Sequence, residues 1–130
     1  MDGSPLGEAA LEFAYEQASV RGVPLIAVHT WWDLIADPKI EPLADWDAME
    51  ADAKVVLAER LAGWPEKYPD VRVHRMVTRE RPAHALVAES RRAQLVVVGS
   101  RGRGSAASLM LGSVSHAVLH RSHCSVAIVR

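Results

Sequence analysis

Hydrophobic and polar positions alternate along this chain with two periods, one typical of helices and one of strands. The first 22 residues predict a helix, because Ser4 suits its cap, Pro5 suits its first position and Gly22 suits its end. Its expected apolar face consists of Leu6, Ala10, Phe13, Ala14 and Ala18. Residues 33–44, which contain Pro38 and Pro42, are expected to be irregular.

Four short segments are expected to be strands. Leu25–Thr30 and Leu95–Gly99 are almost wholly apolar, which is typical of strands covered on both faces of a parallel sheet. Val71–Thr78 mixes apolar and basic residues, which indicates a strand near a sheet edge, and Ser125–Val129 is the last strand.

Helices are expected between these strands. One is capped by Asp45, keeps helical spacing to Leu61 and is closed by Gly63 and Pro65. Others run from Pro82 to about Arg91 and from Ser113 to about Ser122. The alternation predicts one α/β domain over residues 1–130, with helices around an open, mostly parallel sheet.

Composition narrows the classes of function. The 130 residues are 49% hydrophobic and 24% charged, with a formal net charge of −1, so no basic field points to nucleic acid. Cys124 is the only cysteine, which excludes an intrachain disulfide. No apolar run approaches the roughly 18 residues of a membrane span, and the N-terminus does not have the pattern of a signal peptide. We therefore expect a cytoplasmic protein without nucleic-acid or membrane partners.

The loop from Gly99 to Ser113 carries the candidate chemistry. Ligands of open α/β sheets bind beyond the carboxyl ends of the strands, which is where this loop begins. Its glycines permit positive φ and let main-chain N–H groups approach phosphate oxygens, while Ser113 begins a helix whose dipole favours an anion. The alternative is structural, with Gly99 ending a strand and Gly112 making a tight turn.

The spacing Gly99-x2-Gly102-x9-Gly112-Ser113 after an apolar strand resembles the ATP-binding motif of the universal stress protein family. The resemblance extends over the whole chain, through Asp2–Pro5, Leu25–Thr30 and Cys124–Val129. Gly63-Trp64 and residues 68–71 are similar to the second half of actinobacterial tandem members of that family.

The resemblance implies a set of ligand-binding residues. Asp2 matches an acidic residue near the ribose, Thr30 a position lining the adenine site, and Val98 a wall of the base. The phosphate segment corresponds to Gly99, Ser100, Arg101 and Gly102, followed by Gly112, Ser113, Val114 and Ser115 at the helix start. No catalytic or metal-ligating residue is implied.

The family sheet has five parallel strands in the order 3-2-1-4-5, and the first, central strand is missing from this chain. Its loss would separate its neighbours by about 10 Å. Three explanations are open: an upstream start, a remnant of a longer tandem protein, or a strand supplied from elsewhere. The first two are favoured.

The function implied is an ATP-binding stress-response regulator that holds ATP, with Mg²⁺ bound mainly by phosphates and water, and hydrolyses it slowly at most. Pairing through the last strand, as a homodimer or with another domain of the family, is also implied. The alternatives are a degenerate, non-binding half of a tandem protein and, less favoured, an ATP-using enzyme of the same superfamily.

Other chemistries fit the sequence less well. Gly102, Gly104 and Ala107 have dinucleotide-type spacing, but the next strand ends without an acidic residue. No Gly-Lys-Ser/Thr of a phosphate-binding loop occurs. The cluster of His116, His120, His123 and Cys124 is more typical of surface positions than of a metal site.

Overall fold

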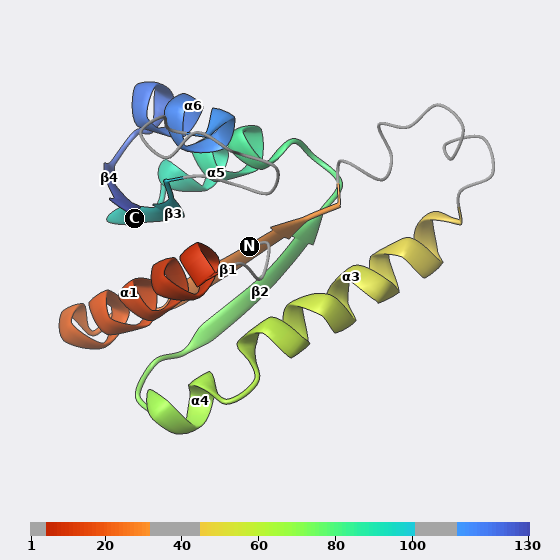
Figure 1. The fold of residues 1–130 in the computed structure, drawn as a ribbon, viewed down its shortest axis with the longest axis horizontal. Helices are drawn as coiled ribbons and strands as arrows, with labels where there is room; N and C mark the ends of the chain where they lie inside the picture. Colours follow the sequence, from red (N-terminus) through yellow and green to blue (C-terminus); the bar gives the residue numbers. More distant parts are fainter. Residues whose placement is uncertain (1–4, 32–44, 101–111) are drawn as a thin grey trace.

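The computed structural model describes residues 5–31, 45–100 and 112–130, and its helices and strands alternate (Figure 1). In chain order they are α1 (Pro5–Arg21), β1 (Leu25–Thr30), α3 (Trp46–Leu61), α4 (Trp64–Lys67), β2 (Val73–Thr78), α5 (Pro82–Ser90), β3 (Leu95–Gly99), α6 (Ser113–Arg121) and β4 (Ser125–Val129). Every strand predicted from the sequence is present, and α4 is the one described helix that the pattern did not predict.

The strands form two parallel pairs. β1 runs beside β2 from Leu25 opposite Val73 to Thr30 opposite Thr78. β3 runs beside β4 from Leu95 opposite Ser125 to Gly99 opposite Val129. The predicted parallel α/β architecture is therefore confirmed. Among the described residues, however, the strands make two two-stranded sheets rather than one continuous sheet.

Helices cover the strands on two sides, and each side has its own hydrophobic cluster. Leu11 and Tyr15 of α1 pack with Ala27 of β1 and with Leu57 and Leu61 of α3. The second cluster joins β3 and β4 to α5 and α6, and its members include Val96, Val98, Val118, Ala83, Leu86 and Ile128. Within the described ranges, no helix is long and apolar enough to cross a membrane.

The buried face of α1 differs from the predicted one. Leu11, Tyr15 and Ala18 are buried, whereas Phe13 and Ala14 are only half-buried. The reason is that α1 contacts β3 and β4 as well as β1, so its apolar surface is wider than a single stripe. The apolar face predicted from spacing was therefore wrong, because the buried face is rotated about the helix axis from it. Ala18 belongs to both faces.

The connection after α3 also differs from the prediction. Asp45 caps α3 as expected, since its carboxylate accepts a hydrogen bond from the Ala48 N–H at 3.2 Å. Gly63 adopts a left-handed φ of 89° and precedes α4, with Pro65 in the first turn of that helix. Gly63 and Pro65 therefore begin a second helix as well as following the first.

Strand β2 begins at Val73, two residues later than predicted. The ladder nevertheless reaches further, because the Leu25 N–H donates to the Arg72 carbonyl at 2.8 Å. His74 and Arg75 are exposed, which confirms the edge character expected from the basic residues of this strand.

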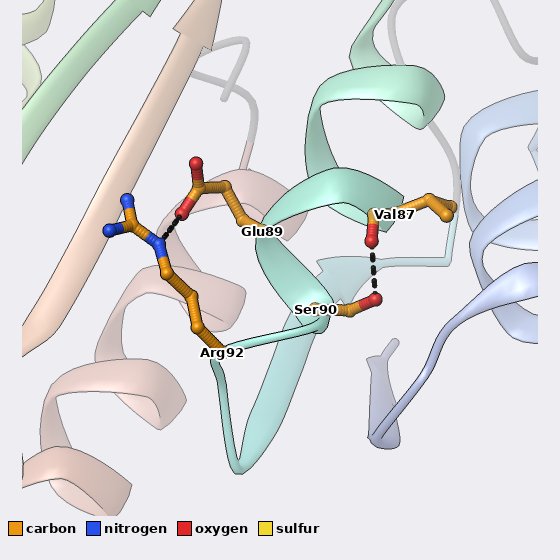
Figure 2. Close-up of polar contacts among 4 residues, drawn as sticks. All are labelled: Val87, Glu89, Ser90 and Arg92. Carbon is orange, nitrogen blue, oxygen red and sulfur yellow. Dashed lines mark hydrogen bonds and ion pairs between the residues drawn. The ribbon is translucent and has the colours of Figure 1, made fainter.

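Ser90, the last residue of α5, makes hydrogen bonds within its helix and to a distant segment (Figure 2). This buried hydroxyl donates to the Val87 carbonyl and accepts a hydrogen bond at 3.0 Å from the main-chain N–H of His123, which precedes β4. Figure 2 also shows the Glu89 carboxylate accepting a hydrogen bond from Arg92 Nε at 2.7 Å. Ser90 therefore ties the end of α5 to the segment that enters the last strand.

An aromatic stack joins α1 to α4. The ring of Tyr15 lies 5.2 Å from that of Trp64 and 5.6 Å from that of Tyr68, both nearly parallel to it. The Tyr15 side chain is fully buried, and its hydroxyl has no hydrogen-bond partner in the described part of the chain. Burial raises the pKa of Tyr15 above its ordinary value of 10.0, an effect that the charge of Arg75 opposes.

We predict that Tyr15→Phe leaves the free energy of unfolding at neutral pH unchanged or raises it, by less than about 1 kcal/mol, because it removes an unsatisfied buried hydroxyl. The unfolded chain loses the Tyr15 proton at lower pH than the folded one, so the wild-type free energy of unfolding falls as pH rises above about 10. Urea denaturation against pH should show a weaker fall for Tyr15→Phe. Equal slopes in the wild type and in Tyr15→Phe would contradict the assignment.

Candidate functional site

The carboxyl ends of the strands bring several predicted residues to one edge of the fold. Thr30 ends β1 opposite Thr78, and Gly99 ends β3 opposite Val129. Helix α6 begins at Ser113, directly after the loop that leaves β3. This is the edge at which open α/β sheets bind ligands.

Ser100 connects the end of β3 to the start of α6. Ser100 is only 5% exposed, and its N–H donates to the Val129 carbonyl at 2.8 Å. Its carbonyl accepts two hydrogen bonds, from the Gly112 N–H at 2.7 Å and from the Ser115 hydroxyl at 3.1 Å. The first turn of α6 is therefore fixed against the end of the β3–β4 ladder.

The start of α6 presents main-chain donors. The His116 N–H donates to the Gly112 carbonyl at 3.0 Å, which makes Ser113, Val114 and Ser115 the first three helical residues. Their N–H groups have no acceptor within the helix, no side chain of the described residues caps them, and the first turn has no acidic residue. Such a helix start favours an anion through both its donors and its dipole.

Gly112 does not use the conformational freedom of glycine. Its φ of −65° and ψ of 163° are accessible to any residue, so the positive-φ turn that would fit the structural alternative for Gly112 is not found at this position. The absence of a side chain next to the N–H groups of α6 is the property of Gly112 that suits close approach of a ligand.

The remaining predicted residues have different settings. Val98 is buried in the cluster with Val96 and Val118, and Val114 is packed against the same cluster. Ser113 is exposed, whereas Ser115 is 2% exposed. Asp2, Arg101 and Gly102 lie outside the described residues.

Residues at the end of β2 were not predicted for this edge. The Thr78 carbonyl accepts a hydrogen bond from the Trp31 N–H at 3.1 Å, which extends the β1–β2 ladder beyond Thr30. The Arg79 guanidinium lies 5.3 Å from the ring of Trp46, and that ring is 5.9 Å from the ring of Trp31. The signal that could have found them is a threonine and a basic residue directly after a predicted strand.

The histidine cluster gives no sign of a metal site. The rings of His116 and His120 lie 4.5 Å apart on α6. Within the ranges 5–31, 45–100 and 112–130, no group of three or more His, Cys, Asp or Glu side chains is placed to hold a metal ion.

Comparison with known sequences identifies the family. The profile of the Universal stress protein family matches residues 1–130. The chain belongs to this family. It is 49% identical to a universal stress protein of Mycolicibacterium smegmatis and 52% identical to one of Mycobacterium tuberculosis, in each case over 100% of this chain. It spans only 44% and 43% of the lengths of those two proteins.

Solved universal stress proteins share the fold. The chain aligns over its full length with UspA from Lactobacillus plantarum, covering 93% of that chain with a TM-score of 0.81 and 21% identity. A protein from Archaeoglobus fulgidus, solved in complex with dAMP, matches over 100% of this chain and 92% of its own with a TM-score of 0.62 and 24% identity. A further universal stress protein, solved in complex with cAMP, matches over 100% of this chain and 91% of its own, with a TM-score of 0.60 and 26% identity.

We predict that Ser115→Ala lowers the free energy of unfolding by about 1 kcal/mol, because the Ser100 carbonyl loses a buried hydrogen-bond donor. The matched control is Ser113→Ala, which removes an exposed hydroxyl from the same helical turn and should change the free energy by less than about 0.5 kcal/mol. Urea denaturation of both variants measures the difference. Equal effects would show that the Ser115 hydroxyl does not hold α6 in place.

Proposed function

We propose that this chain is an ATP-binding domain of the universal stress protein family, which regulates through nucleotide occupancy and hydrolyses ATP slowly at most. The observation that carries the proposal is the start of α6, where the N–H groups of Ser113, Val114 and Ser115 have no helical acceptor. Ser100 holds this helix start at the carboxyl edge of β3, which is where a phosphate chain would lie.

The proposed site divides into a phosphate half and a nucleoside half. Gly99, Ser100, Arg101, Gly102 and residues 112–115 would receive the phosphates. Thr30, Val98 and Asp2 would lie toward the base and ribose. The family relatives solved with dAMP and cAMP support an adenine nucleotide as the ligand class.

Magnesium would be held by the nucleotide rather than by the protein. The first turn of α6 has no acidic residue, and the described side chains supply no ligand cluster for a metal. Mg²⁺ retains several waters and is commonly bound through phosphates. The sequence also has no Gly-Lys-Ser/Thr to place a lysine on a γ-phosphate, which favours occupancy over rapid turnover.

Titration of the chain with Mg-ATP tests this proposal. Binding to the folded state alone should raise the free energy of unfolding by about 2.7 kcal/mol at a hundredfold excess over Kd. A thermal transition indifferent to Mg-ATP would favour the non-binding half of a tandem protein. Steady ATP turnover with an acceptor substrate would favour an enzyme of the same superfamily.

We predict that Ser113→Pro weakens ATP binding about tenfold or more, because proline removes one N–H donor to a charged phosphate. Proline is well tolerated as the first helical residue, and the extended ψ of 163° at Gly112 suits a following proline. The control Ser113→Ala keeps the N–H and should change the affinity less than Ser113→Pro does. Calorimetric titration measures all three proteins, and equal affinities for wild type and Ser113→Pro would contradict binding at α6.

The outer edge of β4 supports a second proposal, pairing with another copy of this chain or another domain of the family. The Ser100 N–H donates to the Val129 carbonyl, so alternation along β4 turns the main-chain groups of Val126 and Ile128 away from β3. Ser125–Val129 has no charged residue to discourage edge pairing.

Sedimentation analysis over a range of concentrations should therefore show a dimer. Amide hydrogen exchange of Val126 and Ile128 should slow as the fraction of dimer rises with concentration. Exchange of Ala127, whose main-chain groups face β3, should change little. A chain that stays monomeric at high micromolar concentration, with no change at Val126 and Ile128, would exclude pairing between identical copies through β4.

A further inference from the structure

Strand β2 has one edge without a ladder partner among the described residues. The Leu25 N–H of β1 donates to the Arg72 carbonyl, and Leu25 lies opposite Val73. In a parallel ladder, such a residue bonds to the two neighbours of the residue opposite it. Alternation therefore turns the main-chain N–H and C=O groups of Val73, Arg75 and Val77 away from β1. We call these main-chain groups the β2 edge.

Helix α3 lies beside β2 on one face of the β1–β2 pair. The two elements are in contact, and Figure 1 shows α3 running alongside β2. The side chains of Val73 and Val77 pack against the cluster that contains Leu57 of α3. Side chains alternate between the two faces of a strand, so that of Arg75 lies on the same face. A segment added at the β2 edge would likewise direct every second side chain toward the face that α3 covers.

A cavity of about 200 Å³ lies between α3 and β2. It is lined by Lys54 and Leu57 of α3 and by Arg75 and Val77 of β2. The leucine and the valine give the cavity an apolar lining, and the lysine and the arginine give it positive charge. Such a lining suits the methylene groups and the carboxylate of one acidic side chain.

Neither cation of this cavity has a strong ion-pair partner in the described part of the chain. Arg75 belongs to none of the ion pairs found there. Lys54 Nζ lies 3.9 Å from a Glu50 carboxylate oxygen, but both side chains are largely exposed, and exposed pairs contribute little. A carboxylate from outside the chain could therefore interact with both Lys54 and Arg75.

The charges along β2 have a single sign. From residue 71 to residue 79 there is no Asp or Glu, and the exposed basic residues are Arg72, His74, Arg75 and Arg79. Like charges on facing strands are destabilising, so these residues disfavour pairing between identical copies through β2. Strand β4, by contrast, has no charged residue. The β2 edge therefore discriminates in favour of an acidic partner.

We propose that the β2 edge binds an extended, acidic segment of a partner protein by strand addition. Main-chain hydrogen bonds to Val73, Arg75 and Val77 would hold the segment, as in other peptides that extend a sheet. A Glu or Asp side chain directed toward α3 would enter the cavity beside Lys54 and Arg75. A nucleic acid could use the charge, but it would use neither the main-chain groups nor the apolar lining. Docking at β2 requires no nucleotide, so its test is separate from that of the proposed function.

The test titrates the chain with a synthetic peptide, acetyl-Thr-Val-Glu-Val-Glu-Val-Thr-amide, whose glutamates share one face of a strand. One control peptide has glutamine in place of both glutamates. A second control keeps both glutamates and has proline in place of the first and third valines, which removes N–H donors and disfavours a strand. Calorimetry measures the affinities, and amide hydrogen exchange locates the bound peptide.

The glutamate peptide should slow amide exchange at Val73, Arg75 and Val77 and leave His74 and Met76, whose main-chain groups face β1, unchanged. The glutamine peptide should bind about tenfold more weakly, because it cannot make charge-assisted hydrogen bonds. The proline peptide should bind more weakly still. Added salt should weaken binding of the glutamate peptide and change that of the glutamine peptide little.

A pair of variants tests the cavity. Arg75→Gln should weaken binding of the glutamate peptide about tenfold, because it removes a cation that lines the cavity. The matched control Arg91→Gln removes the same charge from an exposed position at the end of α5 and should change the affinity less than about twofold. Circular dichroism shows whether both variants keep the wild-type fold.

Four results would each overturn the proposal. The first is unchanged exchange at Val73, Arg75 and Val77 in millimolar glutamate peptide, together with no measurable affinity. The second is equal binding of the proline peptide, which would indicate attraction by charge without strand pairing. The third is equal binding of the glutamine peptide or an equal effect of Arg75→Gln and Arg91→Gln. The fourth is tighter binding of a single-stranded DNA oligonucleotide that Arg75→Gln weakens, which would make this surface a polyanion site.

Discussion

The buried main chain of Ser100 is the junction on which the candidate site depends. Its N–H closes the β3–β4 ladder on Val129, and its carbonyl accepts from Gly112 and Ser115. Because Ser100 is almost fully buried, water cannot reach its main-chain groups, and these hydrogen bonds take the place of bonds to water. The position of the α6 donors relative to the strand ends therefore follows from hydrogen bonding at a single residue.

Helix α1 has the corresponding role for the rest of the fold. Its buried side chains Leu11 and Tyr15 belong to the cluster with β1 and α3, and the same helix contacts β3 and β4. The stack of Tyr15 with Trp64 and Tyr68 holds α4 against it. Packing by α1 and α5 therefore joins two strand pairs that share no ladder in the described part of the chain. The proposed nucleotide site, whose residues belong to both pairs, depends on that packing for its geometry.

Local sequence signals were sufficient for most elements. The apolar runs 25–30 and 95–99 gave the bounds of β1 and β3, and Asp45 capped α3 as expected. The prediction failed for the rotation of α1, because burial there is set by strands distant in sequence. It also missed α4, since Gly63 and Pro65 are typical both of a helix end and of a helix start. At the site, glycine spacing indicated a candidate segment, and the alternative of a positive-φ turn at Gly112 is not what the backbone makes.

The sequence by itself determined the class of fold and the family resemblance, and it indicated a candidate segment for phosphate binding, because periodicity, capping and glycine spacing act within a few residues of the chain. Only the tertiary structure decided which strands pair, that Ser115 bonds to a carbonyl 15 residues earlier, and that Trp31, Trp46 and Arg79 meet at the same edge. These contacts depend on burial and hydrogen bonding between distant segments. Local sequence patterns do not predict these contacts, because each one stabilises the fold only when both of its partner segments are in place.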